Sequence, residues 1–136
     1  MRSGSSQVHA EARRPAVILY AHGARDSRWA EPFLRIAERV RAAAPDLAVE
    51  LAYLEHIEPD LGEAARRLAH RGAREIRVVP LFLGRGGHLR VEIPRLVAAA
   101  AAALPDVTIE LLRPAGDDDA VIDSLAAFCL REACGR

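Results

Sequence analysis

The stretch AVILYA at residues 16–21 is a continuous run of apolar side chains. A run without alternating polar residues is typical of a strand that is buried on both faces of a parallel sheet. The stretch EIRVVPLFL at residues 75–83 is the next most apolar run, although Pro80 lacks a backbone donor and should end the strand or cause a bulge. We therefore expect these two strands at the centre of a sheet.

Two further strand-like runs, at residues 47–54 and 107–112, contain Glu50 and Glu110, which suit the edges of a sheet better than its centre. The segments that follow the four runs predict amphipathic helices. Their inward faces are expected to carry Phe33, Ile36, Ala37 and Val40 in the first, Leu61, Ala65 and Leu68 in 59–71, the alanine-rich part of 91–104, and Val121, Leu125 and Phe128 in the last. Right-handed crossovers then predict an α/β fold, an open parallel four-stranded sheet in the order 2-1-3-4, flanked by helices.

Local signals support these helix boundaries. Pro32 suits the first turn of a helix, where a missing N–H costs little. Gly72 suits a left-handed position after a helix end, and the acids at 117–119 are candidates for the N-cap of the last helix rather than for a metal site. Asp26 is expected to begin a turn before the first helix.

The composition excludes several classes of function. The chain has 136 residues, with 19 acids balanced by 19 arginines, and it contains no lysine. Zero net charge argues against nucleic acid or an anionic membrane as a partner. The absence of lysine excludes a Walker A phosphate loop and Schiff-base chemistry.

The length fits one α/β domain, expected at residues 15–136, that buries its own core without a disulfide or structural metal. Cys129 and Cys134 lack the spacing of a metal or redox motif. Residues 1–14 contain no apolar run that could serve as a signal peptide, so we expect a disordered tail and a cytoplasmic protein.

Potential ligands follow three of the predicted strands. His22 follows the first strand, Glu55 follows the second, and a glycine-rich loop that ends in His88 follows the third. Neighbouring strands lie about 4.8 Å apart, so these side chains can converge at the carboxyl edge of the sheet, where α/β folds bind ligands. Two imidazoles and a carboxylate suit Fe(II), Co(II), Ni(II) or Zn(II).

Other interpretations of these residues remain open. The glycines beside His22 and His88 permit a positive φ and a close approach of backbone to ligand, but they also suit ordinary turns, and the glycine loop could hold a phosphate. A phosphohistidine enzyme would have an arginine before its nucleophilic histidine, where this chain has Ala21. His56 is expected to point away from Glu55, toward the surface, if the second strand continues that far.

Five motifs together resemble the short sirohydrochlorin chelatases. They are AHGARD at 21–26, LAYLE at 51–55, EPDL at 58–61, VVPLFL at 78–83 and GGHLRVEIP at 86–94. The resemblance extends over residues 16–130. It departs mildly from the family pattern at Ala24, Arg85 and Glu92, and Arg85 leaves the contact of the glycine loop with substrate in doubt.

The resemblance implies a chelatase-like lobe that inserts Co(II) or Fe(II) into sirohydrochlorin without ATP or an organic cofactor, in cobalamin or sirohaem biosynthesis, as a homodimer. His22 and His88 correspond to the catalytic histidines, and Glu55 completes the metal site. Sirohydrochlorin is a tetrapyrrole polycarboxylate, and arginine can clamp carboxylates. The candidate substrate-binding residues are Arg25, Arg28, Arg85, Gly86, Gly87 and Arg90. The alternatives are a non-catalytic metal or tetrapyrrole carrier and a phosphoryl-transfer enzyme that uses His22.

Overall fold

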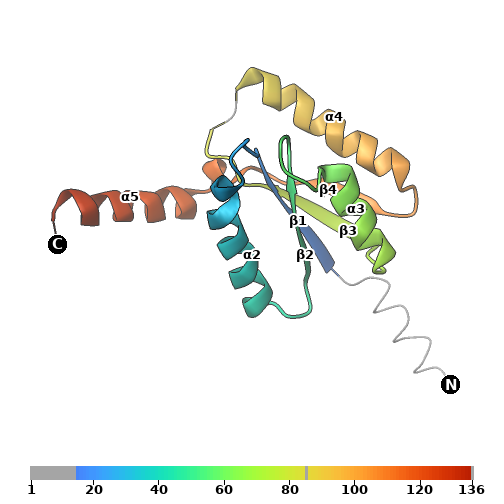
Figure 1. Cartoon of the computed structure of the whole chain (residues 1–136), viewed down its shortest axis with the longest axis horizontal. Coiled ribbons are helices and arrows are strands. Elements are labelled where there is room, and N and C mark those ends of the chain that lie inside the picture. The colour runs from blue at the N-terminus through green and yellow to red at the C-terminus, as the bar shows by residue number, and fades with distance from the viewer. Residues whose placement is uncertain (1–14, 85, 136) are drawn as a thin grey trace.

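A computed structural model describes residues 15–84 and 86–135 of the chain. The tail expected at residues 1–14 lies outside the described residues. The sheet has four parallel strands in the order β2-β1-β3-β4, which confirms the predicted topology (Figure 1). The strands are β1 (Pro15–Ala21), β2 (Ala48–Tyr53), β3 (Glu75–Pro80) and β4 (Thr108–Leu111).

Helical segments connect and follow these strands. They are the 3-10 turn η1 (Ser27–Ala30), α2 (Glu31–Ala43), α3 (Leu61–His70), α4 (Gly87–Ala103), the 3-10 turn η2 (Ala115–Asp117) and α5 (Asp119–Ala133). The local signals are confirmed: Pro32 lies in the first turn of α2, Gly72 has a φ of +98°, and Asp118 caps α5 by accepting a hydrogen bond from the N–H of Val121. No helix among the described residues is long and apolar enough to cross a membrane.

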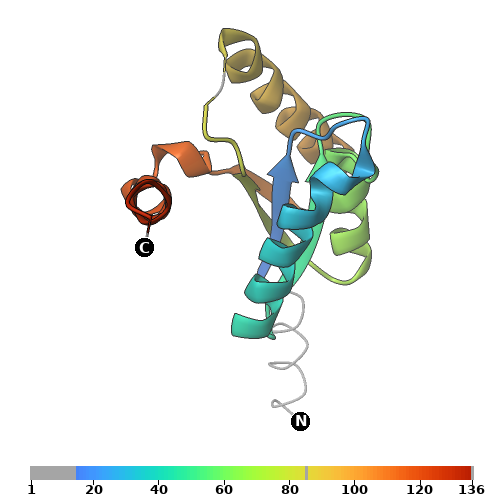
Figure 2. The same cartoon turned by 60° about the vertical axis from the view of Figure 1, so that its left-hand side comes forward.

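The sheet separates two apolar clusters, and Figure 2 shows helices on both sides of it. One cluster joins Ile18, Tyr20 and Val78 to α3 and α4, and the other joins Leu19 and Leu51 to α2. All residues of β1 after Pro15 are buried, as its continuous apolar sequence predicts. The core therefore holds β1 between two layers of helices, with its carboxyl end at one edge of the sheet.

Three expectations are wrong in detail. Helix α4 begins at Gly87, four residues before the predicted start, so His88 lies in its first turn rather than in a loop. Strand β3 ends at Pro80, as the missing donor predicts, but its residues alternate instead of being buried throughout, with Arg77 exposed on the face that none of the described helices covers. Ile36 is 39% exposed on α2 instead of facing the core.

Candidate metal-binding and catalytic site

His22 and Glu55 meet at the carboxyl edge of the sheet. His22 follows β1 directly, Glu55 follows β2 by two residues, and these strands are neighbours with Ala21 opposite Tyr53. Nε2 of His22 lies 3.1 Å from Oε1 of Glu55, and both side chains are about half exposed. When Nε2 donates to the carboxylate, Nδ1 keeps a lone pair that can accept a proton or bind a metal ion.

Gly23 allows the two loops to approach this closely. The backbone N–H of Glu55 donates to the carbonyl of His22 at 3.1 Å. Gly23 has a φ of +91°, and a Cβ on this residue would lie 1.8 Å from the carbonyl oxygen of Glu55. Only glycine satisfies both constraints, so the expected positive φ is confirmed, and the close approach that Gly23 permits here is to the backbone of Glu55.

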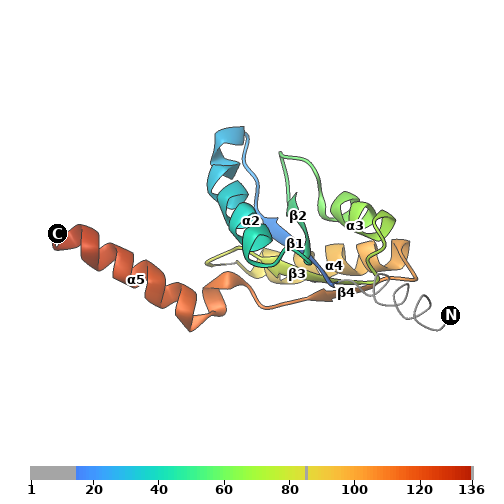
Figure 3. The ribbon, with the colours of Figure 1, turned by 90° about the horizontal axis from the view of Figure 1, so that it is seen from below.

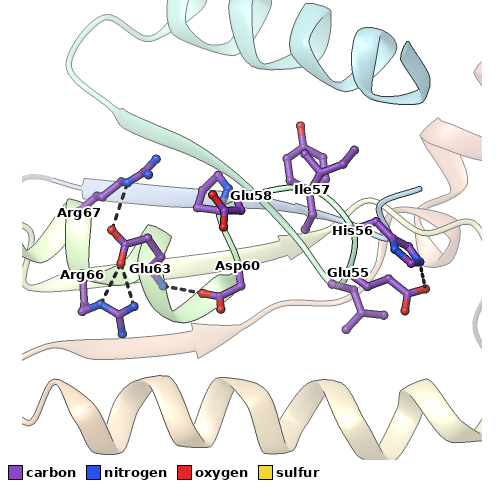
Figure 4. Close-up of a pocket in the computed structure, with 11 residues that line it drawn as sticks. Glu55, His56, Ile57, Glu58, Asp60, Glu63, Arg66 and Arg67 are labelled. Carbon is purple, nitrogen blue, oxygen red and sulfur yellow. Dashed lines mark hydrogen bonds and ion pairs between the residues drawn. The ribbon is translucent and has the colours of Figure 1, made fainter. Parts of the chain in front are cut away.

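His56 lies closer to Glu55 than the sequence suggests. Its Nε2 is 3.8 Å from Oε1 of Glu55, and Figure 4 shows the two side chains pointing toward one another. His56 is exposed, as expected of a surface residue, but it does not point away from Glu55, because β2 ends at Tyr53 and strand alternation no longer applies. The φ of His56 is +68°, a backbone conformation that is uncommon outside glycine.

His88 belongs to a different pair. In the first turn of α4 its Nε2 contacts Oε2 of Glu92, four residues further along the helix. Within the part of the chain that the structure describes, no three His, Cys, Asp or Glu side chains lie close enough to hold a metal ion. The structure thus brings His22 and Glu55 together and leaves His88 outside that pair.

Aromatic packing surrounds His22 at the end of β1, and the charge of Glu92 acts on the same region. The ring of Phe82 packs edge-on against both Tyr20 and His22, with centroids 6.3 and 6.1 Å apart. Burial, together with the negative charges of Glu92 and Asp60, raises the pKa of Tyr20 to about 12. The start of α4 is therefore near enough to the end of β1 for its carboxylate to act there.

A pocket of about 610 Å³ lies beside Glu55, between the loop after β2 and helix α3 (Figure 4). Arg66 and Arg67 of α3 line it, and both contact Glu63, at 2.8 and 3.5 Å. These arginines were not among the predicted site residues, because they lie on the polar face of a helix. The helical spacing of Glu63, Arg66 and Arg67 soon after Glu55 was the signal that could have found them.

The predicted substrate-binding residues are placed differently from one another. Arg25 and Arg90 are exposed, and neither forms an ion pair with the described residues. Arg28 is bound to Asp26 at 2.8 Å, and Asp26 also caps η1, as expected of a turn residue. Gly86 and Gly87 are exposed with open space around them, whereas Arg85 lies outside the described residues.

A comparison with models of protein families shows to which family the chain belongs. The CbiX family model matches residues 16–129, which include β1 to β4 and both histidine–carboxylate pairs. The chain belongs to the CbiX family. Among curated relatives, the sirohydrochlorin cobaltochelatase of Sulfolobus acidocaldarius is 32% identical over 80% of this chain and 85% of its own length. The sirohydrochlorin cobaltochelatase of Methanocaldococcus jannaschii is 35% identical over 60% of this chain and 57% of its own length.

Solved structures of CbiX and SirB proteins share this fold. The putative cobalamin biosynthesis CbiX protein of Marinobacter aquaeolei VT8 superposes with a TM-score of 0.79 at 33% identity, over 89% of this chain and 98% of that chain. The sirohydrochlorin chelatase SirB of Bacillus subtilis in complex with cobalt gives a TM-score of 0.69 at 28% identity, over 78% of this chain and 45% of that chain. This CbiX chain therefore corresponds to about half of SirB.

Proposed function

We propose that this CbiX chain inserts Co(II) or Fe(II) into sirohydrochlorin, with the metal ion as a substrate and no organic cofactor. The observation that supports it most is the His22–Glu55 pair at the carboxyl edge of the sheet, in a chain of a family whose curated relatives are sirohydrochlorin cobaltochelatases. SirB, a structural relative, is known in complexes with cobalt and with Fe³⁺.

The reaction exchanges one divalent ion for two pyrrole N–H protons. Each proton needs an acceptor, and a neutral imidazole is a suitable base near neutral pH. His22 beside Glu55 and His88 beside Glu92 are two such imidazoles, each next to a carboxylate that can stabilise the imidazolium. In the proposed mechanism His22 and Glu55 bind the incoming ion above the macrocycle. After the ion passes to the ring nitrogens, the freed Nδ1 of His22 accepts one pyrrole proton and the imidazole of His88 accepts the other.

The exposed arginines supply positive charge that can bind the carboxylates of the substrate. Sirohydrochlorin carries carboxylates around its ring. Arg25 lies exposed three residues after His22, and Arg90 lies exposed in the first turn of α4. A guanidinium can bind a carboxylate in a bidentate manner. Arg28 and Arg85 remain candidates, although Arg28 would have to exchange its contact with Asp26.

We also propose a homodimer. The chain aligns with 45% of SirB, so a second copy would supply a number of residues comparable to the rest of that longer protein. A symmetric pair with two identical lobes is the commonest arrangement for such a chain.

Replacing Glu55 by glutamine should weaken Co(II) binding at least about tenfold, because glutamine keeps the shape and a hydrogen-bonding oxygen but lacks the negative charge. The dissociation constant for Co(II) is measured by isothermal titration calorimetry of the metal-free protein. Glu58→Gln is the matched control, since Glu58 is exposed in the same loop and lines the same pocket. Equal Co(II) affinity in Glu55→Gln and Glu58→Gln would contradict the proposed metal site.

Replacing His88 by alanine should slow Co(II) insertion by about 10²-fold, the lower range for loss of a general base. The rate is followed by the absorbance of the tetrapyrrole under anaerobic conditions. Turnover close to that of the unmodified protein would show that one histidine suffices and that the two-histidine mechanism is wrong.

A further inference from the structure

His56 carries an imidazole that the proposed mechanism leaves unused. Its Nε2 lies 3.8 Å from Oε1 of Glu55, the same oxygen that lies 3.1 Å from Nε2 of His22. A separation of 3.8 Å is too long for a hydrogen bond. It leaves room for a divalent first-row ion such as Zn(II), which forms bonds of about 2.0–2.2 Å to imidazole nitrogen and carboxylate oxygen. His56 and Glu55 can therefore share an ion that lies between these two atoms.

Hydrogen bonds hold the loop that carries His56. The N–H of Ile57 donates to the carbonyl of Glu55 at 2.9 Å, which closes a three-residue turn with His56 at its centre. The φ of His56 is +68°, close to the value of about +75° in the rare γ-turn of positive φ. The N–H of Tyr53 donates to the carbonyl of Pro59 at 2.9 Å and closes the base of the loop, which Figure 3 shows beyond the end of β2, between α2 and α3. The turn thus holds this imidazole beside the carboxylate of its neighbour, in a backbone conformation that concentrates at functional sites.

The pair of His56 and Glu55 lies at one end of the pocket beside α3. Among the described residues, both side chains line this pocket of about 610 Å³, whereas His22 is not part of its lining. Figure 4 shows the pair close together, with Arg66 and Arg67 further away. An ion that moves through this pocket therefore meets His56 and Glu55 before it reaches His22.

The charge of the pocket favours a cation. Four carboxylates and two guanidiniums of the described residues line it: Glu55, Glu58, Asp60, Glu63, Arg66 and Arg67. Both guanidiniums contact Glu63, so the excess negative charge lies on the loop side, near His56. A cleft with an excess of one sign of charge raises the local concentration of ions of the opposite sign.

Two protein ligands suit an ion that has to move on. Within the described part of the chain, no third His, Cys, Asp or Glu side chain joins His56 and Glu55. Water would therefore occupy the remaining positions of an ion bound there, and water is readily exchanged for another ligand. Because Glu55 belongs to both pairs, its carboxylate can keep the ion while His22 replaces His56.

We propose that His56 and Glu55 form a loading site for Co(II) or Fe(II), from which Glu55 passes the ion to His22. The transfer exchanges one imidazole ligand for another and needs no further reactant. This inference rests on the proposed function, because it describes the route to the proposed metal site. It is tested without tetrapyrrole, since it concerns metal binding alone.

Stopped-flow mixing of the full, metal-free chain with Co(II) tests the loading site. Trp29 is the single tryptophan, and its ring lies 6.5 Å from that of Tyr53, so quenching of its fluorescence reports binding near the end of β2. His56→Asn should lower the association rate constant about 10–100-fold, the range for loss of a residue that supports a metal site. His70→Ala is the matched control, because His70 is exposed and lines a different pocket. Equal association rates in His56→Asn and His70→Ala would overturn the proposal.

Asparagine is the replacement of choice because it tolerates a positive φ, which keeps the turn while the imidazole is removed. If circular dichroism shows that His56→Asn does not fold, His56→Gly takes its place, because glycine adopts this φ without cost. The same loss of rate is expected, and an unchanged rate would equally overturn the proposal. An unmodified protein that does not bind Co(II) would overturn the proposed metal site as well, whereas normal binding with an unchanged rate in the His56 variant would overturn the loading site alone.

Calorimetric titration in the His22→Ala background shows whether the loading site binds metal by itself. His22→Ala should still bind one Co(II) ion, more weakly than the unmodified protein, because His56 and Glu55 remain. Adding His56→Asn should abolish this binding, whereas adding His70→Ala should leave it unchanged. A His22→Ala protein that binds no Co(II), or residual binding that survives the loss of His56, would overturn the proposal.

Discussion

Replacing His22 by alanine is expected to lower the rate of Co(II) insertion by about 10²–10⁴-fold, the range for loss of a positioned general base. The expectation follows from the position of this imidazole, 3.1 Å from Glu55 and half exposed at the edge of the sheet where ligands bind. In the proposed mechanism, the change removes a metal ligand and a proton acceptor together. The measurement is the initial rate of tetrapyrrole absorbance change under anaerobic conditions.

His70→Ala is the control for this experiment. His70 is exposed in the last turn of α3, and it lies in a different surface pocket from Glu55. Its replacement should leave the insertion rate unchanged. If His22→Ala and His70→Ala inserted metal equally fast, His22 would have no part in the chemistry.

Replacing Gly23 by alanine is expected to destabilise the protein by about 2–5 kcal/mol and to abolish insertion. A positive φ costs a residue with a Cβ roughly 1–2 kcal/mol, and forcing an extra carbon into a packed site adds about 1–3 kcal/mol. Here the added carbon would meet the carbonyl of Glu55 at 1.8 Å, so the Glu55 loop must move away from His22.

Gly72→Ala separates the two effects. Gly72 has a φ of +98°, close to that of Gly23, but no atom lies within 4 Å of the position of its Cβ. It should lose about 1–2 kcal/mol for the dihedral alone and keep full activity. The free energies of unfolding come from urea titrations with the m-values compared. A loss in Gly23→Ala no greater than that in Gly72→Ala would mean that the contact with Glu55 does not constrain the site.

The order of the strands could be predicted because acid positions reveal the edges of the sheet. Glu50 and Glu110 would be costly in a strand buried on both faces, and both lie on edge strands in the structure. Glu50 contacts Arg67 and Arg71 of α3 there. Once strands β1 and β2 are neighbours, the residues that follow them must lie close, so the approach of His22 to Glu55 follows from topology.

The positions of His56 and His88 could not be predicted from periodicity. Strand β2 ends two residues before Glu55, and the reversal after it turns His56 toward that carboxylate. Gly86 and Gly87 are poor helix formers, so they conceal the start of α4 and the pairing of His88 with Glu92. Both contacts are local in sequence, but neither could be predicted without the correct end of β2 and the correct start of α4.

Helix α5 shows a different limit of sequence reasoning. The helix forms as predicted, but the expectation that its apolar residues face inward is wrong, because Leu125 is 41% and Phe128 is 50% exposed. The pattern of Val121, Leu125 and Phe128 is the same whether a covering surface belongs to its own chain or to another. The exposure of Leu125 and Phe128, together with the open groove that Leu81 and Leu111 line beside β3, is visible only in three dimensions.

The rate of Co(II) insertion into sirohydrochlorin tests the central claim most directly. The unmodified chain, the metal and the tetrapyrrole are mixed anaerobically without ATP, and the absorbance of the metallated product is compared with that of a reaction without protein. Our account predicts many turnovers per protein chain at a rate well above the spontaneous one. Stoichiometric binding of Co(II) or tetrapyrrole, with product formed only at the spontaneous rate, would contradict it and identify the chain as a carrier.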